Sequence, residues 1–205
     1  MKKTASIFVF LLLFVAFSYA QDPIDNSEPN FFLTINGTLG KHTINFKNFA
    51  KSSGYSFGFS VSAGIYAVHK GDYKGGLVFT LLEGASRNPD RRQISEDFEL
   101  PHKSFDKHII FNFAQFRSGT IGWFQQIKIT DTLDFYHQLG FGVFGTTEKD
   151  QLLDFGMANQ AGILIGNKDS FRFRLGTTYD TTFGTGNPNY KQNNIGLTFG
   201  GFNSF

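Results

Sequence analysis

Six ionisable side chains in the second half of the chain occupy even-numbered positions: Lys128, Asp134, Tyr136, Arg172, Arg174 and Asp180. Side chains two residues apart lie on one face of an extended strand, so these six are expected on the same side of a sheet. Charges shielded from water must pair, because an unpaired buried charge costs a large desolvation free energy. The spacing predicts an ion-pair network that fills a narrow interior. The alternative for the same residues is a path for a proton or a small solute.

Hydrolytic catalysis would need a serine, a histidine and a carboxylate within reach of one another. His137 lies on the apolar side of its segment, opposite the six side chains. Ser118, Ser170 and Ser204 fall at expected turns or at the chain end, without a nucleophile-elbow motif. We therefore name no catalytic residue, although the missing motif leaves enzymatic activity open.

One strongly charged segment contains two histidines and two further carboxylates: Glu99, His102, Asp106 and His108. Imidazole and carboxylate groups can bind metals, but this spacing matches no metal motif. We predict no metal site and no cofactor. Arg91 and Arg92 in the same segment are suited to lipid phosphates, because guanidinium groups match phosphate oxygens in geometry.

The chain begins with the three-part layout of a cleavable secretory signal. Lys2 and Lys3 precede an apolar stretch over 7–17, and Ser18-Tyr19-Ala20 supplies small residues for cleavage. The alternative is an N-terminal anchor helix, but the apolar stretch is short for a membrane span. The expected organisation is a signal peptide (1–20), an N-terminal extension (21–30) and one barrel domain (31–205).

The composition of the mature chain excludes several classes of protein. Without Lys2 and Lys3, 17 basic side chains remain against 17 acidic ones, so there is no basic excess for binding nucleic acid. The absence of cysteine excludes disulfides, thiolate metal sites and cysteine nucleophiles. No later segment has the roughly 18 consecutive apolar residues of a membrane helix. Entry into a membrane would therefore require strands closed on themselves.

Beyond residue 30, apolar and small polar residues alternate with the same parity over most of the chain. In one segment the apolar positions are Tyr55, Phe57, Phe59, Val61, Ala63 and Ile65, and Ser or Gly stands between them. The polar face is rich in Gly, Ser, Thr, Gln and Asn, whereas a solvated face usually carries many Lys and Glu. This pattern predicts a narrow barrel with its apolar face toward lipid. The alternative is the Phe-rich core of a soluble sandwich.

Residues 108–129 decide the number of strands. As one long strand they place Arg117 on the outward face, beyond the membrane, because a charge at mid-bilayer costs about 2–4 kcal/mol. This interpretation gives eight strands, the first within 31–49, and puts the charged loop 84–107 outside. A turn at Ser118-Gly119 would give ten strands and a periplasmic loop. We predict eight.

The signal, the strands of about ten residues, the asymmetric loops and the final strand over 194–205 resemble the small outer-membrane β-barrel proteins of Gram-negative bacteria, the OmpA-like and OmpX-like class. The resemblance is architectural and covers residues 31–205. In that class, a terminal aromatic residue preceded by alternating apolar residues is read by the barrel-insertion machinery. The resemblance thus assigns this role to Leu197, Phe199 and Phe205, although Asn203 stands where the pattern favours an apolar side chain.

These observations predict an all-β protein, a closed antiparallel up-and-down transmembrane β-barrel of the outer membrane, exported by its signal peptide. We expect a non-enzymatic role in envelope structure or in surface interaction through the loops. The expected partners are outer-membrane lipids, lipopolysaccharide and, during assembly, the insertion machinery. One alternative is a lipid-modifying barrel enzyme acting on lipopolysaccharide. Another is a soluble periplasmic β-barrel or sandwich that binds a ligand.

Overall fold

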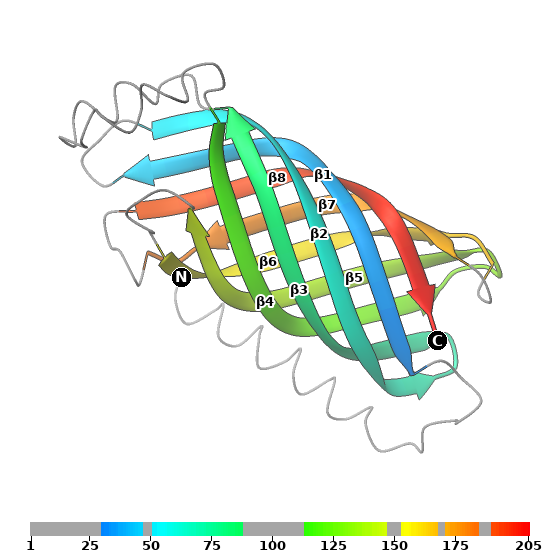
Figure 1. Cartoon of the computed structure of the whole chain (residues 1–205). Helices are drawn as coiled ribbons and strands as arrows, with labels where there is room; N and C mark the ends of the chain where they lie inside the picture. Colours follow the sequence, from blue (N-terminus) through cyan, green and yellow to red (C-terminus); the bar gives the residue numbers. More distant parts are fainter. Residues whose placement is uncertain (1–29, 47–50, 88–112, 147–152, 168–170, 185–189) are drawn as a thin grey trace.

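The computed structural model describes residues 30–46, 51–87, 113–146, 153–167, 171–184 and 190–205. These residues form eight strands: β1 (Phe31–Phe46), β2 (Lys51–Lys70), β3 (Tyr73–Arg87), β4 (Phe113–Lys128), β5 (Leu133–Thr146), β6 (Leu153–Ile165), β7 (Arg172–Thr182) and β8 (Tyr190–Ser204). Each strand pairs with the next along the chain, and β8 pairs antiparallel with β1 (Figure 1). The predicted closed up-and-down barrel of eight strands is confirmed.

The strand β4 settles the choice between eight and ten strands. It runs without a break through Ser118 and Gly119 and pairs with β3 along its whole length. The alternative turn at this position is therefore wrong. β3 extends to Arg87, into the segment expected to be a loop, because its last residues find partners on β4.

The two ends of the barrel differ. β2, β4, β6 and β8 finish at the end of the barrel where Phe205 lies, called here the turn end, and β1, β3, β5 and β7 finish at the opposite loop end (Figure 1). At the turn end, Gly71 connects β2 to β3 with a φ of 56°, in the left-handed region that glycine adopts without strain.

The pairing register sets the width of the barrel. Residues paired directly across neighbouring strands can be followed around the barrel from Gly37 on β1. In one direction the pairs run through Phe59, Glu83 and Arg117 to Gly145 on β5. In the other direction they run through Phe199, Leu175 and Ile163 to Phe135, also on β5. Both paths reach β5 at residues ten positions apart, Gly145 and Phe135, so the shear number is 10. A barrel of eight strands has an interior only wide enough for side chains.

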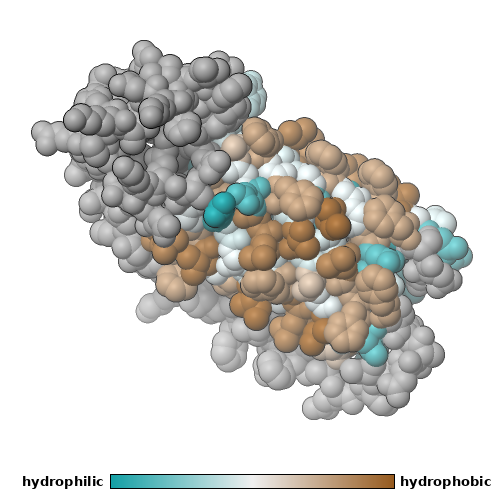
Figure 2. All heavy atoms as spheres, in the orientation of Figure 1, coloured by the Kyte–Doolittle hydropathy of each residue, from teal (hydrophilic) through white to brown (hydrophobic). Residues whose placement is uncertain are grey.

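The distribution of side chains is the reverse of that in a soluble barrel. Outward positions carry large apolar groups that remain exposed, such as Leu81 at 54% and Ile121 at 63%. Inward positions carry buried polar groups such as Thr34 and Ser60. Figure 2 shows hydrophobic side chains covering the middle of the barrel wall. Such a large continuous apolar surface suits lipid and is rare on proteins in water.

Glycines make the interior wide enough for aromatic rings. A Cβ atom at Gly64 would overlap the ring of Phe32, and one at Gly84 would overlap the ring of Phe116. The sequence pattern of aromatic residues and glycines therefore has a packing reason inside the barrel, where a large side chain on one strand needs a small one on its neighbour.

Candidate functional site

A layer of aromatic and aliphatic side chains blocks the lumen in its turn-end half. It consists of Phe32, Tyr66, Val78, Phe124, Tyr136, Leu164 and Phe202 and is called here the aromatic layer. The ring centroids of Phe32 and Phe124 lie 4.5 Å apart, and Phe124 stacks on Phe202 at 5.8 Å. Each side chain of the layer is at most 4% exposed. The lumen is therefore packed as a core at this level.

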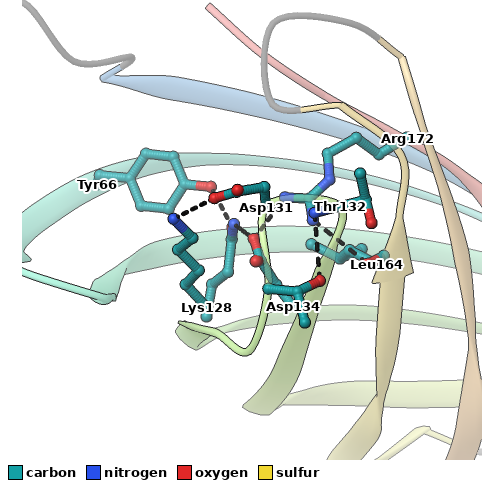
Figure 3. A network of polar contacts seen from close by, with 9 residues as sticks. Tyr66, Lys128, Asp131, Thr132, Asp134, Leu164 and Arg172 are labelled. Carbon is teal, nitrogen blue, oxygen red and sulfur yellow. Dashed lines mark hydrogen bonds and ion pairs between the residues drawn. The ribbon is translucent and has the colours of Figure 1, made fainter.

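A buried ion pair lies beside this layer, between β5 and β7. The Nη1 atom of Arg172 is 2.6 Å from Oδ2 of Asp134, and the two side chains are 2% and 1% exposed (Figure 3). Nη2 of Arg172 donates to the carbonyl oxygen of Leu164 on the intervening strand β6 at 3.3 Å. Gln126 donates to the same carboxylate and accepts from the hydroxyl of Tyr66 at 2.8 Å. The pair is thus tied to strands on several sides of the barrel.

Arg174 is fully buried and is held by neutral groups. Its Nη2 atom donates to Oε1 of Gln160 at 2.9 Å and to Oε1 of Gln138 at 3.3 Å. Its guanidinium carbon lies 4.1 Å from the ring centroid of Tyr136, a cation–π geometry. In the part of the chain that the structure describes, no carboxylate forms an ion pair with Arg174. Gln138 continues the chain of hydrogen bonds to Thr80 at 2.8 Å.

Asp180 lies in the loop-end half of the lumen, away from both arginines. Its carboxylate accepts hydrogen bonds from Thr178 and Asn194, each at 3.2 Å. Ser56 donates to the same asparagine at 2.9 Å. Lys128 faces the β4–β5 turn, where its Nζ atom pairs with Asp131 at 2.6 Å.

The structure therefore divides the six residues of the expected network into separate groups. It brings Asp134 to Arg172 and Tyr136 to Arg174. Asp180 bonds to Thr178 and Asn194 instead, and Lys128, although it is the strand partner of Asp134, forms its ion pair with Asp131. The connecting side chains that sequence reasoning missed are amides: Gln126, Gln138, Gln160 and Asn194. All four occupy even-numbered positions, as the predicted charges do, so the same alternation could have identified them as lumen-facing side chains.

The polar side chains of the outward face include an ion pair and a histidine with amide partners. Arg117 pairs with Glu83 at 2.7 Å toward the loop end, and both side chains are 60% exposed. His137 lies nearer the turn end on β5, in contact with Gln125 at 3.0 Å and Asn159 at 2.9 Å. Neither hydrogen-bond partner of this histidine is a nucleophile or a carboxylate, so the contacts of a Ser–His–Asp triad are not formed around it.

Neither of the two described serines considered from sequence is a hydrogen-bond partner of His137. Ser118 is buried in the lumen within β4, not at a turn, and Ser204 ends β8. Ser170 lies outside the described residues.

Comparison with solved structures finds the same architecture. The outer membrane enzyme PagL matches with a TM-score of 0.52 and 9% sequence identity, over 84% of this chain and 99% of that chain. The fold is that of the small outer-membrane β-barrels. Neisserial surface protein A aligns over 85% of this chain and 97% of its own, with a TM-score of 0.48 and 11% identity. Ail of Yersinia pestis aligns over 84% and 99%, with a TM-score of 0.42 and 11% identity.

At these identities the likeness concerns the outer-membrane barrel fold alone. No protein family matches the chain by sequence, and no curated protein sequence does so. Within the described ranges, no helix is long and apolar enough to cross a membrane.

Of the residues of the predicted terminal signal, Leu197 and Phe199 lie outward on β8, and Phe205 directly follows this strand. Leu197, Phe199 and Phe205 are 59%, 42% and 65% exposed, and the ring of Phe199 covers Gly37 on β1. Arg91, Arg92 and the charged segment around His102 lie outside the described residues, and so do residues 1–29. Among the residues that are described, no three His, Asp or Glu side chains gather to hold a metal ion.

Proposed function

We propose that this protein is a closed, non-enzymatic barrel of the outer membrane that serves envelope structure or surface interaction through its loops. The observation that carries the proposal is the packed lumen. The aromatic layer and the adjacent Arg172–Asp134 pair are almost completely buried, as in a protein core. A wall of strands around such an interior anchors loops in a membrane but offers no aqueous path.

The location in the outer membrane is supported by two physical features. The apolar outward face needs lipid, and a barrel of strands is the form in which a chain without later apolar helices can span a bilayer. The N-terminal pattern over residues 1–20 is typical of an exported protein. The outward residues Leu197, Phe199 and Phe205 fit the terminal signal by which the insertion machinery would recognise β8.

Anionic lipids, including lipopolysaccharide, are the partners that the loop-end surface suits. Lys41 and Lys191 face outward there on neighbouring strands. Below them, a shallow apolar groove of about 490 Å³ is lined by Leu39, Gly40, Thr177, Thr178, Tyr179, Ile195, Gly196 and Leu197. An acyl chain fits such a groove, while the ammonium groups attract lipid phosphates. Arg91 and Arg92 would add guanidinium donors from their loop.

Planar-bilayer recording tests the closed lumen. The refolded wild-type protein should insert without a stable open state, because the aromatic layer leaves no continuous water path. A matched variant with Phe32, Phe124 and Phe202 replaced by Ala should show increased conductance if it folds. A stable open state of appreciable size in the wild type contradicts the proposal whatever the variant does.

Two further measurements test the remaining parts. After incubation with lipopolysaccharide, mass spectrometry should find the lipid unchanged, and loss or gain of an acyl chain would refute the non-enzymatic role. In cell fractionation the protein should require detergent for extraction from the outer membrane. Recovery in the soluble periplasmic pool would refute the location.

A further inference from the structure

A row of three polar side chains crosses the lipid-facing surface of β4, β5 and β6. Gln125 contacts Nδ1 of His137 through its amide nitrogen at 3.0 Å, and Nε2 of His137 contacts Oδ1 of Asn159 at 2.9 Å. All three are half-buried, and we call them the polar row. They face outward, because each has the odd parity of the apolar wall.

The polar row lies inside the apolar belt and not at its edge. The outward residues before and after each member on its own strand are apolar: Trp123 and Ile127, Phe135 and Leu139, Met157 and Ala161. By contrast, the outward ion pair of Glu83 and Arg117 lies toward the loop end. Polar side chains at membrane depth are rare and usually have a function, so the row needs an explanation.

The row leaves hydrogen-bonding capacity unused. The amide nitrogen of Gln125 donates, so Nδ1 of His137 accepts and the N–H at Nε2 donates to Asn159. Within the described residues, Oε1 of Gln125 and Nδ2 of Asn159 then have no hydrogen-bond partner. Acyl chains cannot supply one, and polar groups without partners in hydrocarbon are costly. Lipid headgroups lie at the membrane surfaces and not beside the middle of the belt.

We propose that the polar row is the centre of an interface with a second copy of this chain. Two barrels inserted in the same direction present identical residues at identical depth, and a two-fold axis along the membrane normal brings them face to face. At Asn159, each amide can donate from Nδ2 to the Oδ1 atom of the other copy, because a carbonyl oxygen has a second lone pair. Ala161, the next outward residue on β6, is small enough to allow close approach.

This inference rests on the membrane location proposed above, and the test separates the two. The chain has no cysteine, so a single introduced cysteine can carry a fluorophore. Energy transfer between labelled copies in phosphatidylcholine vesicles should rise with the protein-to-lipid ratio as dimers form. Asn159→Leu should weaken association at least tenfold, whereas Thr43→Val, an outward polar position on β1, should leave it unchanged.

Heat-modifiable gel migration must be the same for both variants and the wild type, which shows that the barrels are folded. A wild type that inserts and migrates normally but stays monomeric at every ratio overturns this inference alone. Association of Asn159→Leu equal to that of the wild type also overturns it. The inference is also overturned if the barrel is monomeric and a lipid or an unrelated protein binds at the polar row. Failure of the wild type to insert instead contradicts the proposed function.

Discussion

Arg172 and Asp134 illustrate how a single buried pair can hold a barrel together. Their side chains join β5 to β7 across β6, and the arginine also bonds to Leu164 on the strand between them. A buried pair adds little stability relative to apolar residues of the same size, because both ions lose their hydration. Removal of one partner is different, because the other charge then stays buried without compensation.

We expect Arg172→Leu to lower the free energy of unfolding by about 3–5 kcal/mol, since the buried carboxylate of Asp134 then has no ion-pair partner. Urea unfolding of the refolded protein in lipid vesicles measures this change. The double variant with Asp134→Leu should lose less than the single one. Glu83→Gln breaks the exposed pair with Arg117 and should cost at most about 1 kcal/mol. Equal losses for the exposed and the buried pair would contradict this account.

The space that glycines leave for aromatic rings inside the barrel leads to a second prediction. Gly64→Ala places a Cβ atom against Phe32 and the backbone of Leu77, and should cost about 1–3 kcal/mol through overpacking. Gly119 is the matched control, because a Cβ atom there meets only Leu81 at 3.6 Å. Gly119→Ala should unfold at the same urea concentration as the wild type or higher. The interpretation fails if the two alanine variants are equally stable.

At the scale of residues, parity predicts the face of a side chain but not its partner. Arg174 and Asp180 share a strand and a face, yet one contacts Gln138 and the other Asn194. Partners depend on the register of strands that are distant in sequence, and alternation carries no information about register. Amides complete these contacts because they donate and accept hydrogen bonds without adding charge.

Among the elements, β4 was the hardest to predict. Ser118-Gly119 has the composition of a turn, and Arg117 interrupts the apolar parity just before it. In the structure, β3 and β5 pair with β4 on both sides through this stretch, and Glu83 neutralises Arg117. Local sequence could not decide between a turn and a strand here, because the backbone partners and the carboxylate that pair with this stretch belong to other strands.

The lipid-facing side of β4 predicts how depth controls tolerance to charge. Ile121 lies on the same face as Arg117, four residues further toward the turn end, and is 63% exposed. Ile121→Arg should cost about 2–4 kcal/mol, because its guanidinium would enter the hydrocarbon. The same urea titration measures the loss, with Ile121→Leu as control. A variant as stable as the wild type would mean that this face does not contact lipid.

The last strand can be tested for its role in assembly. Phe205→Ser should reduce the amount of protein in the outer membrane several-fold, if the terminal aromatic residue is read by the insertion machinery. The same variant should refold in vitro like the wild type, because Phe205 is 65% exposed and packs little. Quantitative immunoblotting of membrane fractions measures the first effect. Asn203→Leu is the control and should not reduce assembly.

At the scale of the whole molecule, the constant parity of apolar and small residues predicted the architecture. The strands share one alternation, and closure of the barrel then puts the exposed large apolar side chains on the outward side, while the aromatic layer faces inward. The position of a functional site is harder to predict from the sequence, because the side chains inside the barrel serve packing. The loops expected to carry surface contacts, such as 84–107, have no periodic pattern from which a shape follows.

The central claim is that the barrel is apolar outside and closed inside, with its outward face in lipid. Spin labels on single cysteines at positions 57–62 of β2 in lipid vesicles test it most directly, since the chain has no native cysteine. Labels at Phe57, Phe59 and Val61 should be accessible to oxygen and shielded from a water-soluble relaxation agent. Labels at Ser60 and Ser62 should be immobile and reached by neither. Odd positions open to the water-soluble agent, or no difference between the two parities, would contradict the account.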